Sequence, residues 1–203
     1  MKIESLNAVD TPAGEPISRI ATRARGGDPE AFRSIFARYG RPVLGFIYNL
    51  VGDRPHAEDL TQETFVRAYR KLATVQEETR LSTWLFGIAR NVVHEAIREK
   101  SRQRKIELDE EAGASIGTSD AGPYQQLVNG ELQRAIRLAL EALPEDHRLV
   151  FVLKMLHNLS YDEIAQVTGS SVGKLKTDLH RARLEMRRLL KVWGAKTEPR
   201  GEL

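Results

Sequence analysis

The 203-residue sequence contains no cysteine. Disulfide bonds, zinc sites with thiolate ligands and a cysteine nucleophile are therefore excluded. The sequence also lacks any apolar run near the roughly 20 residues that span a bilayer, and its first residues lack the apolar segment of a signal peptide. We therefore expect a cytoplasmic protein that does not insert into a membrane.

Patterns typical of catalysis and metal binding are missing as well. The five histidines and the carboxylates show no spacing typical of metal ligands or of a catalytic triad. Glu58, Asp59 and Glu63 lie close together in the sequence, but we interpret them as solvated or interfacial carboxylates. The sequence therefore predicts a protein that is not an enzyme and that holds no metal or other cofactor.

The alternating pattern of β-strands is absent, and the periodicity that is present is helical. Asp28 followed by Pro29 is typical of a helix N-cap with proline at the first helical position. Pro42 is expected to break or restart this helix, and residues 52–55 to form a turn. Further helices are expected at about 57–72, at about 82–100 and from residue 131 onward, so the predicted fold class is all-α.

Charge is distributed unevenly, although the net charge is only +3. Residues 106–133 hold six acidic and no basic residues (−6), residues 90–105 hold six basic and two acidic (+4), and residues 174–200 hold nine basic and three acidic (+6). Glycine, serine and threonine are frequent in 106–123, which is typical of a linker. We expect two small helical domains, 25–105 and 131–193, joined by a flexible acidic linker at 106–130, with tails at 1–24 and 194–203.

The second domain contains a pattern typical of a helix-turn-helix. Ser160 and Glu163 match a capping box, Gly169 allows the chain to leave the first helix, and Ser171 can cap the second. Apolar residues at steps of three and four predict a buried stripe on the second helix: Val172, Leu175, Leu179, Ala182 and Met186. The opposite face carries Gly173, Thr177, His180, Arg181 and Leu184, flanked by Lys174 and Lys176. This basic face indicates nucleic-acid binding, and the alternative is a solvated helical face.

The helix expected at 57–72 has two different faces. One is expected to lie in the core and carries Ala57, Thr61, Thr64, Ala68 and Leu72. The opposite face carries Asp59, Gln62, Glu63, Val66 and Arg70. An apolar Val66 among polar residues suggests a contact patch, but single exposed apolar residues are common, and the pattern alone does not decide between the two.

Four further segments accompany the helix-turn-helix: DPEAF (28–32), AEDLTQETF (57–65), STWLFGIARN (82–91) and ALPEDHRLVF (142–151). In this order, over residues 27–190, the five segments resemble bacterial sigma factors of the extracytoplasmic-function (ECF) group. The resemblance implies a region 2 bundle and a region 4 helix-turn-helix bundle joined by a linker. It also implies the function of an alternative sigma factor, which directs RNA polymerase core to specific promoters and assists promoter opening.

The resemblance assigns roles to residues of the first domain. It places Asp59, Gln62, Glu63 and Val66 at the contact with the clamp helices of the polymerase β′ subunit. Asn91 matches a position that reads the minus-ten element, and the candidate DNA contacts around it are Arg80, Arg90, His94 and Arg98. The loop 73–81 matches one that captures a flipped base, and Trp84 either supports this pocket or is a half-buried packing residue.

The same resemblance places the minus-thirty-five element against the second helix of the helix-turn-helix. Lys176, Thr177, His180 and Arg181 match positions that read bases in the major groove, whereas Lys174 and Arg183 suit phosphate contacts. The implied partners are the polymerase core, through β′ and the β flap, promoter DNA and an anti-sigma factor. The acidic linker matches a segment that threads toward the RNA exit channel.

Three positions depart from the family pattern. The family commonly has Gly-Thr-Val-Lys-Ser-Arg at residues 173–178, so Asp178 replaces an arginine, and either a contact within the domain or a shifted minus-thirty-five preference would explain it. The loop 75–79 lacks the usual aromatic residue and glycine. Asn158 stands where glycine is usual, and asparagine tolerates a left-handed backbone.

Two other functions are weaker alternatives. A sigma mimic would sequester an anti-sigma factor without binding promoters, but such proteins usually carry a receiver domain and lose the basic reading face. A free-standing helix-turn-helix repressor would leave residues 28–105 unexplained.

Overall fold

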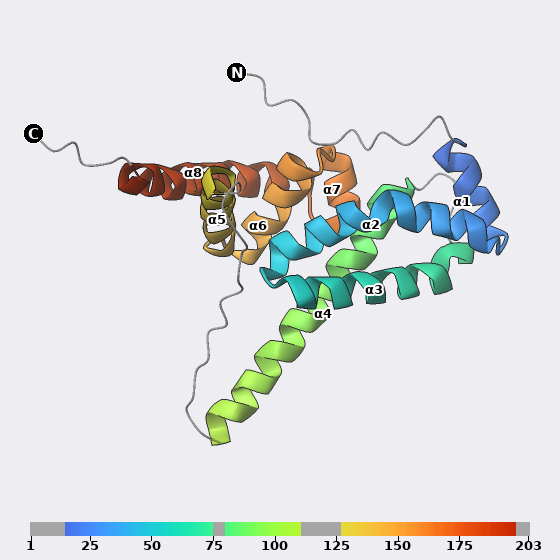
Figure 1. The fold of residues 1–203 in the computed structure, drawn as a ribbon, viewed down its shortest axis with the longest axis horizontal. Coiled ribbons are helices and arrows are strands. Elements are labelled where there is room, and N and C mark those ends of the chain that lie inside the picture. The colour runs from blue at the N-terminus through green and yellow to red at the C-terminus, as the bar shows by residue number, and fades with distance from the viewer. Residues whose placement is uncertain (1–14, 75–79, 111–126, 198–203) are drawn as a thin grey trace, which may run out of the picture.

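The computed structural model describes residues 15–74, 80–110 and 127–197, and these contain helices but no strand. The prediction of an all-α fold is confirmed. The helices, labelled in Figure 1, are α1 (Ile17–Arg25), α2 (Pro29–Val51), α3 (Arg54–Lys71), η1 (Leu72–Thr74), α4 (Leu81–Glu110), α5 (Leu127–Glu141), α6 (Glu145–Phe151), η2 (Val152–Leu156), α7 (Tyr161–Thr168) and α8 (Val172–Thr197). The central part of the expected linker, residues 111–126, lies outside the described residues.

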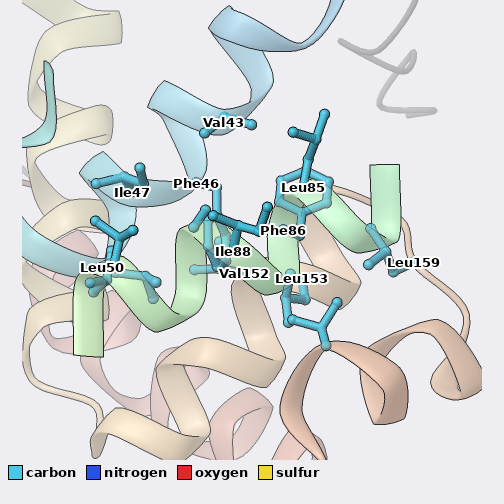
Figure 2. Close-up of a cluster of buried hydrophobic side chains, with 14 of the residues drawn as sticks. Val43, Phe46, Ile47, Leu50, Leu85, Phe86, Ile88, Val152, Leu153 and Leu159 are labelled. Atoms are coloured by element: carbon cyan, nitrogen blue, oxygen red, sulfur yellow. The ribbon is translucent and has the colours of Figure 1, made fainter. Parts of the chain in front are cut away.

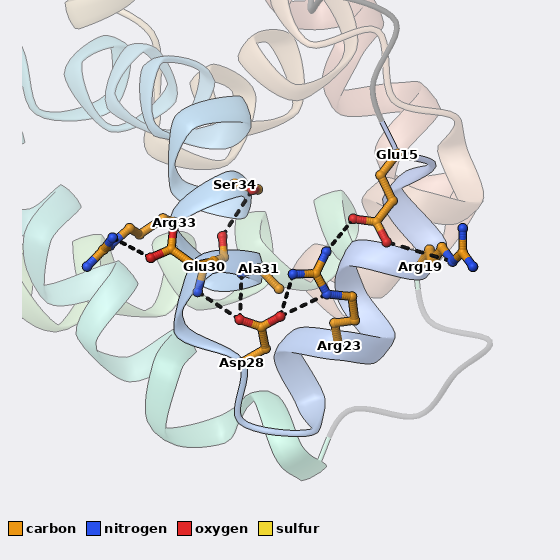
Figure 3. Close-up of polar contacts among 8 residues, drawn as sticks. All are labelled: Glu15, Arg19, Arg23, Asp28, Glu30, Ala31, Arg33 and Ser34. Atoms are coloured by element: carbon orange, nitrogen blue, oxygen red, sulfur yellow. Dashed lines mark hydrogen bonds and ion pairs between the residues drawn. The ribbon is translucent and has the colours of Figure 1, made fainter.

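The corner between α1 and α2 is fixed by Asp28, as predicted from its pairing with proline (Figure 3). Its carboxylate accepts from the backbone N–H groups of Glu30 (2.9 Å) and Ala31 (3.3 Å), which have no partner inside the helix. The guanidinium of Arg23, at the end of α1, donates from Nε to the same carboxylate at 2.8 Å and from Nη1 to Glu15 at 2.6 Å. This hydrogen bond from Arg23 lowers the pKa of Asp28.

Helix α2 continues through Pro42, so the expected break at this residue is wrong. Proline removes one backbone donor and crowds the preceding turn, at a cost of about 3 kcal/mol in a helix interior. Ile35, Val43, Phe46 and Ile47 on either side of Pro42 are completely buried. Burial of about 1.5–3 kcal/mol per such side chain therefore outweighs the cost of the proline.

The first bundle packs α2 against α3 and α4, with α1 across α2. The predicted core side of α3 is confirmed, because Ala57, Thr61, Thr64, Ala68 and Leu72 are all buried. Helix α4 continues to Glu110, past its expected end near Lys100, and its last turns project away from the rest of the molecule (Figure 1).

The second bundle consists of α5, α6, η2, α7 and α8. Pro144 separates α5 from α6, as expected, and η2 is a five-residue π-helical turn that ends at Leu156. In α5 the buried residues are Ala135, Ala139 and Leu140. Leu132, on the same helix, lies outside this buried side and is 50% exposed.

The two bundles share one hydrophobic core (Figure 2). Val43, Phe46, Ile47 and Leu50 come from α2, and Leu85, Phe86 and Ile88 come from α4. Val152, Leu153 and Leu159 come from the second bundle and meet them there. Helix α4 is therefore buried on two sides, by the first bundle and by α7, which contacts it extensively.

Polar contacts reinforce this shared core. The Arg148 guanidinium, on α6, donates to the backbone oxygen of Leu50 at 2.8 Å and to that of Glu141 at 2.7 Å. Arg137, on α5, donates to the Tyr48 hydroxyl at 3.0 Å. The carbonyl of Leu50, near the end of α2, thus gains a partner from the other bundle.

His157 lies at the centre of the junction between the bundles. Its imidazole packs against the rings of Phe86 (centroids 4.7 Å apart) and Phe46 (5.8 Å). Its Nε2 is shielded from solvent and has no hydrogen-bond partner. Burial lowers the pKa of His157 to about 4, because the apolar surroundings disfavour the charged form.

This histidine makes the free energy of unfolding depend on pH. The folded pKa is below the unfolded value of about 6.5, so the unfolded state takes up more protons as the pH falls from about 6.5 to about 4. We expect about 2 kcal/mol of stability to be lost between pH 8 and pH 5 through His157 alone. Urea unfolding of the wild type and of His157→Phe at both pH values measures this difference.

The matched control is His180→Phe, at an exposed position on α8. Its loss of stability between pH 8 and pH 5 should equal that of the wild type. An equal loss in His157→Phe as well would show that His157 does not titrate with the transition.

Candidate protein and nucleic-acid interfaces

The polar face of α3 is exposed, as the sequence predicted. Asp59 and Gln62 face solvent, and Val66 is 42% exposed between them and Arg70. Glu63 is half-buried, because Arg67 donates to its carboxylate at 2.7 Å and also to Glu95 of α4 at 2.7 Å. Asp59 therefore lies on an accessible surface, and Glu63 is held in place beside it by Arg67.

Two aromatic residues extend this surface, and the sequence reasoning missed them. Tyr69 is 57% exposed and Phe36, on α2, is 50% exposed. Tyr69 packs edge-on against Phe32 (5.0 Å), and Phe36 packs against Phe65 (4.8 Å). Tyr69 follows Val66 by three residues and could have been found from helical periodicity, whereas Phe36 is placed there only by the packing of α2 on α3.

The basic face of α4 is only partly accessible. Asn91 and Arg98 are exposed, but Arg90 and His94 are half-buried. Arg90 and His94 line a cavity of about 100 Å³ together with Leu50, Val93, Glu145, Asp146 and Leu149. Two acids at the start of α6 thus face two of the residues expected to contact the minus-ten element.

Arg80, another expected minus-ten contact, is paired with the second bundle. Its guanidinium donates to Glu163 at 2.8 Å, and this ion pair joins the start of α4 to the start of α7. The preceding loop residues 75–79 lie outside the described residues. Trp84 is half-buried and packs against the core, which agrees with the packing role considered for it.

The helix-turn-helix has the predicted local geometry. Ser160 and Glu163 form a reciprocal capping box. The Glu163 N–H donates to the Ser160 hydroxyl at 3.2 Å, and the Ser160 N–H donates to the Glu163 carboxylate at 2.8 Å. Gly169 has φ 72°, and the Ser171 hydroxyl accepts from the Lys174 N–H at 3.3 Å. Asn158 has φ 53°, which confirms that asparagine takes the left-handed conformation there.

Helix α8 presents the predicted reading face. Leu175, Leu179, Ala182 and Met186 are buried, and Val172 is half-buried. On the opposite side Thr177, His180 and Arg181 are exposed, and so are Lys176 on its flank and Arg183 next to the buried stripe. Lys176 also lies over the Tyr161 ring, 5.7 Å from its centroid, and Arg183 contacts the Met155 sulfur at 3.2 Å. These five sequence-predicted residues are thus all accessible.

Lys174 and Asp178 behave differently from the rest of α8. The Lys174 ammonium donates to Asp178 at 2.6 Å and to Asp146 of α6 at 2.7 Å. Asp178 is buried. A contact within the domain was one of two explanations for an acid at position 178, and this contact is confirmed.

Comparison with known proteins identifies this combination of bundles. Residues 35–103 match the family model described as sigma-70 region 2, and residues 133–186 match the model described as sigma-70, region 4. The chain is 31% identical over 182 residues to the ECF RNA polymerase sigma factor SigW of Bacillus subtilis, covering 86% of this chain and 97% of the relative. It is 30% identical to the ECF sigma-E factor of Haemophilus influenzae, covering 81% and 89%. The chain belongs to the ECF sigma factors and is an alternative sigma factor.

Solved structures show the same arrangement of helices. The sigma factor RpoE of Bartonella quintana, in complex with the anti-sigma factor NepR, matches with a TM-score of 0.66 and 26% identity over 79% of this chain and 97% of that one. CnrH, in complex with the cytosolic domain of CnrY, matches with a TM-score of 0.66 over 86% and 97%, and at 24% identity this likeness concerns the fold.

Within the described ranges, no helix is long and apolar enough to cross a membrane. No three His, Asp or Glu side chains in these ranges come together as a group that could hold a metal ion.

The exposed guanidinium of Arg181 provides a test of base reading by α8. If it donates to guanine acceptors, Arg181→Ala should weaken binding of the polymerase holoenzyme to its promoter by about 1–3 kcal/mol, and binding to unrelated DNA by much less. The promoter is found by mapping the transcripts that the chain induces. Gel-shift titration with this promoter fragment and with an unrelated fragment measures both affinities. Arg187→Ala, an exposed arginine further along α8, is the control. An equal loss on both DNAs would mean that Arg181 contacts phosphates only.

Proposed function

We propose that the chain docks on RNA polymerase core and directs it to promoters that carry matching minus-ten and minus-thirty-five elements, with no catalytic activity of its own. Region 2 would contact the β′ clamp helices through Asp59, Gln62, Glu63 and Val66, and region 4 would contact the β flap. Since the polymerase works in the cytoplasm, we place this sigma factor there.

One observation carries the proposal most directly. The α3 face and the reading face of α8 are both exposed on the same chain, although the two bundles bury much of α4 between them. A protein that binds polymerase and DNA needs both surfaces. A sigma mimic would need no accessible basic reading face, so the exposure of Lys176, His180 and Arg181 favours the promoter-binding function.

An anti-sigma factor is the remaining partner that we propose. The matched RpoE structure is a complex with the anti-sigma factor NepR, and CnrH is in complex with the cytosolic domain of CnrY. By analogy, a partner of this class would bind the present chain and keep it from the polymerase.

Reversal of charge on the α3 face tests the docking surface. Asp59→Arg combined with Glu63→Arg should abolish co-purification with core polymerase, because both acids would become cations on a surface that we expect to face a basic partner. The fold should remain intact, since neither side chain lies in the core. Co-purification from cells and circular dichroism give the two measurements.

The control carries the same change in charge elsewhere. Glu30 and Glu99 are exposed on α2 and α4, outside the proposed surface, so Glu30→Arg with Glu99→Arg should co-purify normally. Unchanged co-purification of the Asp59 and Glu63 variant would refute the docking assignment.

Reading both promoter elements requires the two bundles to separate. The element positions imply centres about 25 base pairs apart, which is about 85 Å of B-form DNA. In the structure the two bundles are packed together, and we call this the closed arrangement. Arg80 then lies 2.8 Å from Glu163, and α7, a helix of about 12 Å, leads directly into α8. The two reading surfaces are therefore a few tens of Å apart at most, too close to occupy both elements.

Separation exposes the shared core to water. Phe46, Phe86 and Leu153 would each lose part of the burial that contributes about 1.5–3 kcal/mol per side chain. Contacts with polymerase and DNA must offset this cost. The closed arrangement is therefore the state of the free chain, and the separated arrangement is the state of the bound chain.

A cross-link across the junction tests this separation. The chain has no cysteine, so Tyr48→Cys with Arg137→Cys provides one pair of thiols, at two positions of α2 and α5 whose present side chains meet through a 3.0 Å hydrogen bond. Joining them with a short bismaleimide should abolish run-off transcription with core polymerase. The same variant with its thiols blocked by N-ethylmaleimide should remain active.

Two other results would change the interpretation. Full activity of the cross-linked chain would contradict separation. No run-off by the wild type with core polymerase at any promoter would favour the sigma mimic.

A further inference from the structure

Lys174 stands at the third position of α8, where a cation could reach a DNA phosphate, but two carboxylates occupy its ammonium group. Nζ lies 2.6 Å from Asp178, one turn further along α8, and 2.7 Å from Asp146 at the start of α6. The Asp178 side chain is 10% exposed, whereas that of Asp146 is 69% exposed. The bond to Asp178 is therefore the one that is shielded from water and salt.

The surroundings of Asp178 make this bond costly to break. A largely buried carboxylate without its counter-ion is strongly disfavoured, and more so beside a polyanion such as DNA. The other basic side chain near Asp178 among the described residues is that of His147, whose Nε2 lies 3.8 Å from the second carboxylate oxygen, beyond hydrogen-bonding distance. A phosphate that captured Lys174 would thus leave Asp178 charged and poorly compensated.

The pair has no evident role in stabilising α8 itself. A cation in the first turn of a helix is disfavoured by the helix dipole, and a basic residue followed by an acidic residue four positions later is the weaker order for a pair. The hydrogen bonds do raise the pKa of Lys174, with Asp146 as the largest cause. The geometry thus keeps a charged lysine on the edge of the reading face while directing it toward protein.

We propose that Asp178 is a specificity-determining residue that withholds Lys174 from promoter DNA. The inference rests on the proposed function of α8 as the reader of the minus-thirty-five element. With Lys174 held by carboxylates, α8 makes one phosphate contact fewer than it would with Lys174 free. Its affinity for non-specific DNA is therefore lower, while its contacts with bases are unchanged. Recognition then depends on Lys176, Thr177, His180 and Arg181.

The test is the salt dependence of binding of the full chain, in complex with core polymerase, to a 40-base-pair duplex of random sequence. Each phosphate contact contributes about 0.9 to the slope of log K against log salt concentration. Lys174→Met should leave the slope unchanged. Asp178→Asn should free Lys174 and steepen the slope by about 0.9, and the double variant Lys174→Met/Asp178→Asn should return to the wild-type slope.

Arg183→Met is the matched control, since Arg183 is an exposed cation on the same helix, without a carboxylate partner among the described residues, at a position that suits a phosphate contact. It should reduce the slope by about 0.9. Thermal melting of each variant verifies the fold. If Asp178→Asn does not fold, Lys174→Met still tests the proposal, because a smaller slope in this variant would show that Lys174 contacts phosphate although Asp178 is present.

The outcomes distinguish failure of the proposal on Asp178 from failure of the proposed DNA binding by α8. A smaller slope in Lys174→Met would show that Lys174 contacts phosphates and would overturn the proposal while supporting DNA binding by α8. A steeper slope of Asp178→Asn that persists in the double variant would mean that Asp178 acts by its own charge, and would also overturn it. An unchanged slope in Arg183→Met would instead contradict the phosphate contact expected of α8, and would overturn both proposals.

Discussion

The arrangement of this sigma factor depends on one hydrophobic junction, in which the π-helical turn η2 and Leu159 of region 4 pack against α2 and α4 of region 2. Phe46 and Phe86 enclose the His157 ring at its centre. Other features follow from this packing. It buries a second side of α4, brings Arg80 to Glu163, and leaves Arg90 and His94 half-covered beside the acids of α6.

The junction divides the surfaces of the molecule into two kinds. The α3 face and the reading face of α8 lie outside it and are accessible in the closed arrangement. The basic side of α4 lies at its edge and is partly covered. Polymerase and the minus-thirty-five element could thus be met first, and the minus-ten contacts would become available as the bundles part. Binding energy from the accessible surfaces is what would offset the exposure of the shared core.

Much of the helical structure was predictable from the sequence, because helical periodicity and capping depend on residues a few positions apart. The N-caps at Asp28 and Ser160, the buried sides of α3 and α8 and the exposed Val66 all follow from residues a few positions apart. The contact of Phe86 with His157 was not predictable, because His157 belongs to region 4, far away in the sequence. Pro42 was misjudged for a related reason, since only tertiary packing outweighs its local cost. The contact of Lys174 with Asp146 was missed because Asp146 belongs to another helix.

The shared core also bears on how long the protein lasts in a cell. While the bundles are together, Phe46, Phe86 and Leu153 are buried and hidden from proteases. If the bundles separate on the polymerase, as proposed above, a chain released after initiation exposes these apolar side chains until the bundles meet again. Degradation of such a chain would depend on how fast the junction re-forms relative to cleavage. The packing that limits promoter access would therefore also set the turnover of sigma factor that is no longer in use.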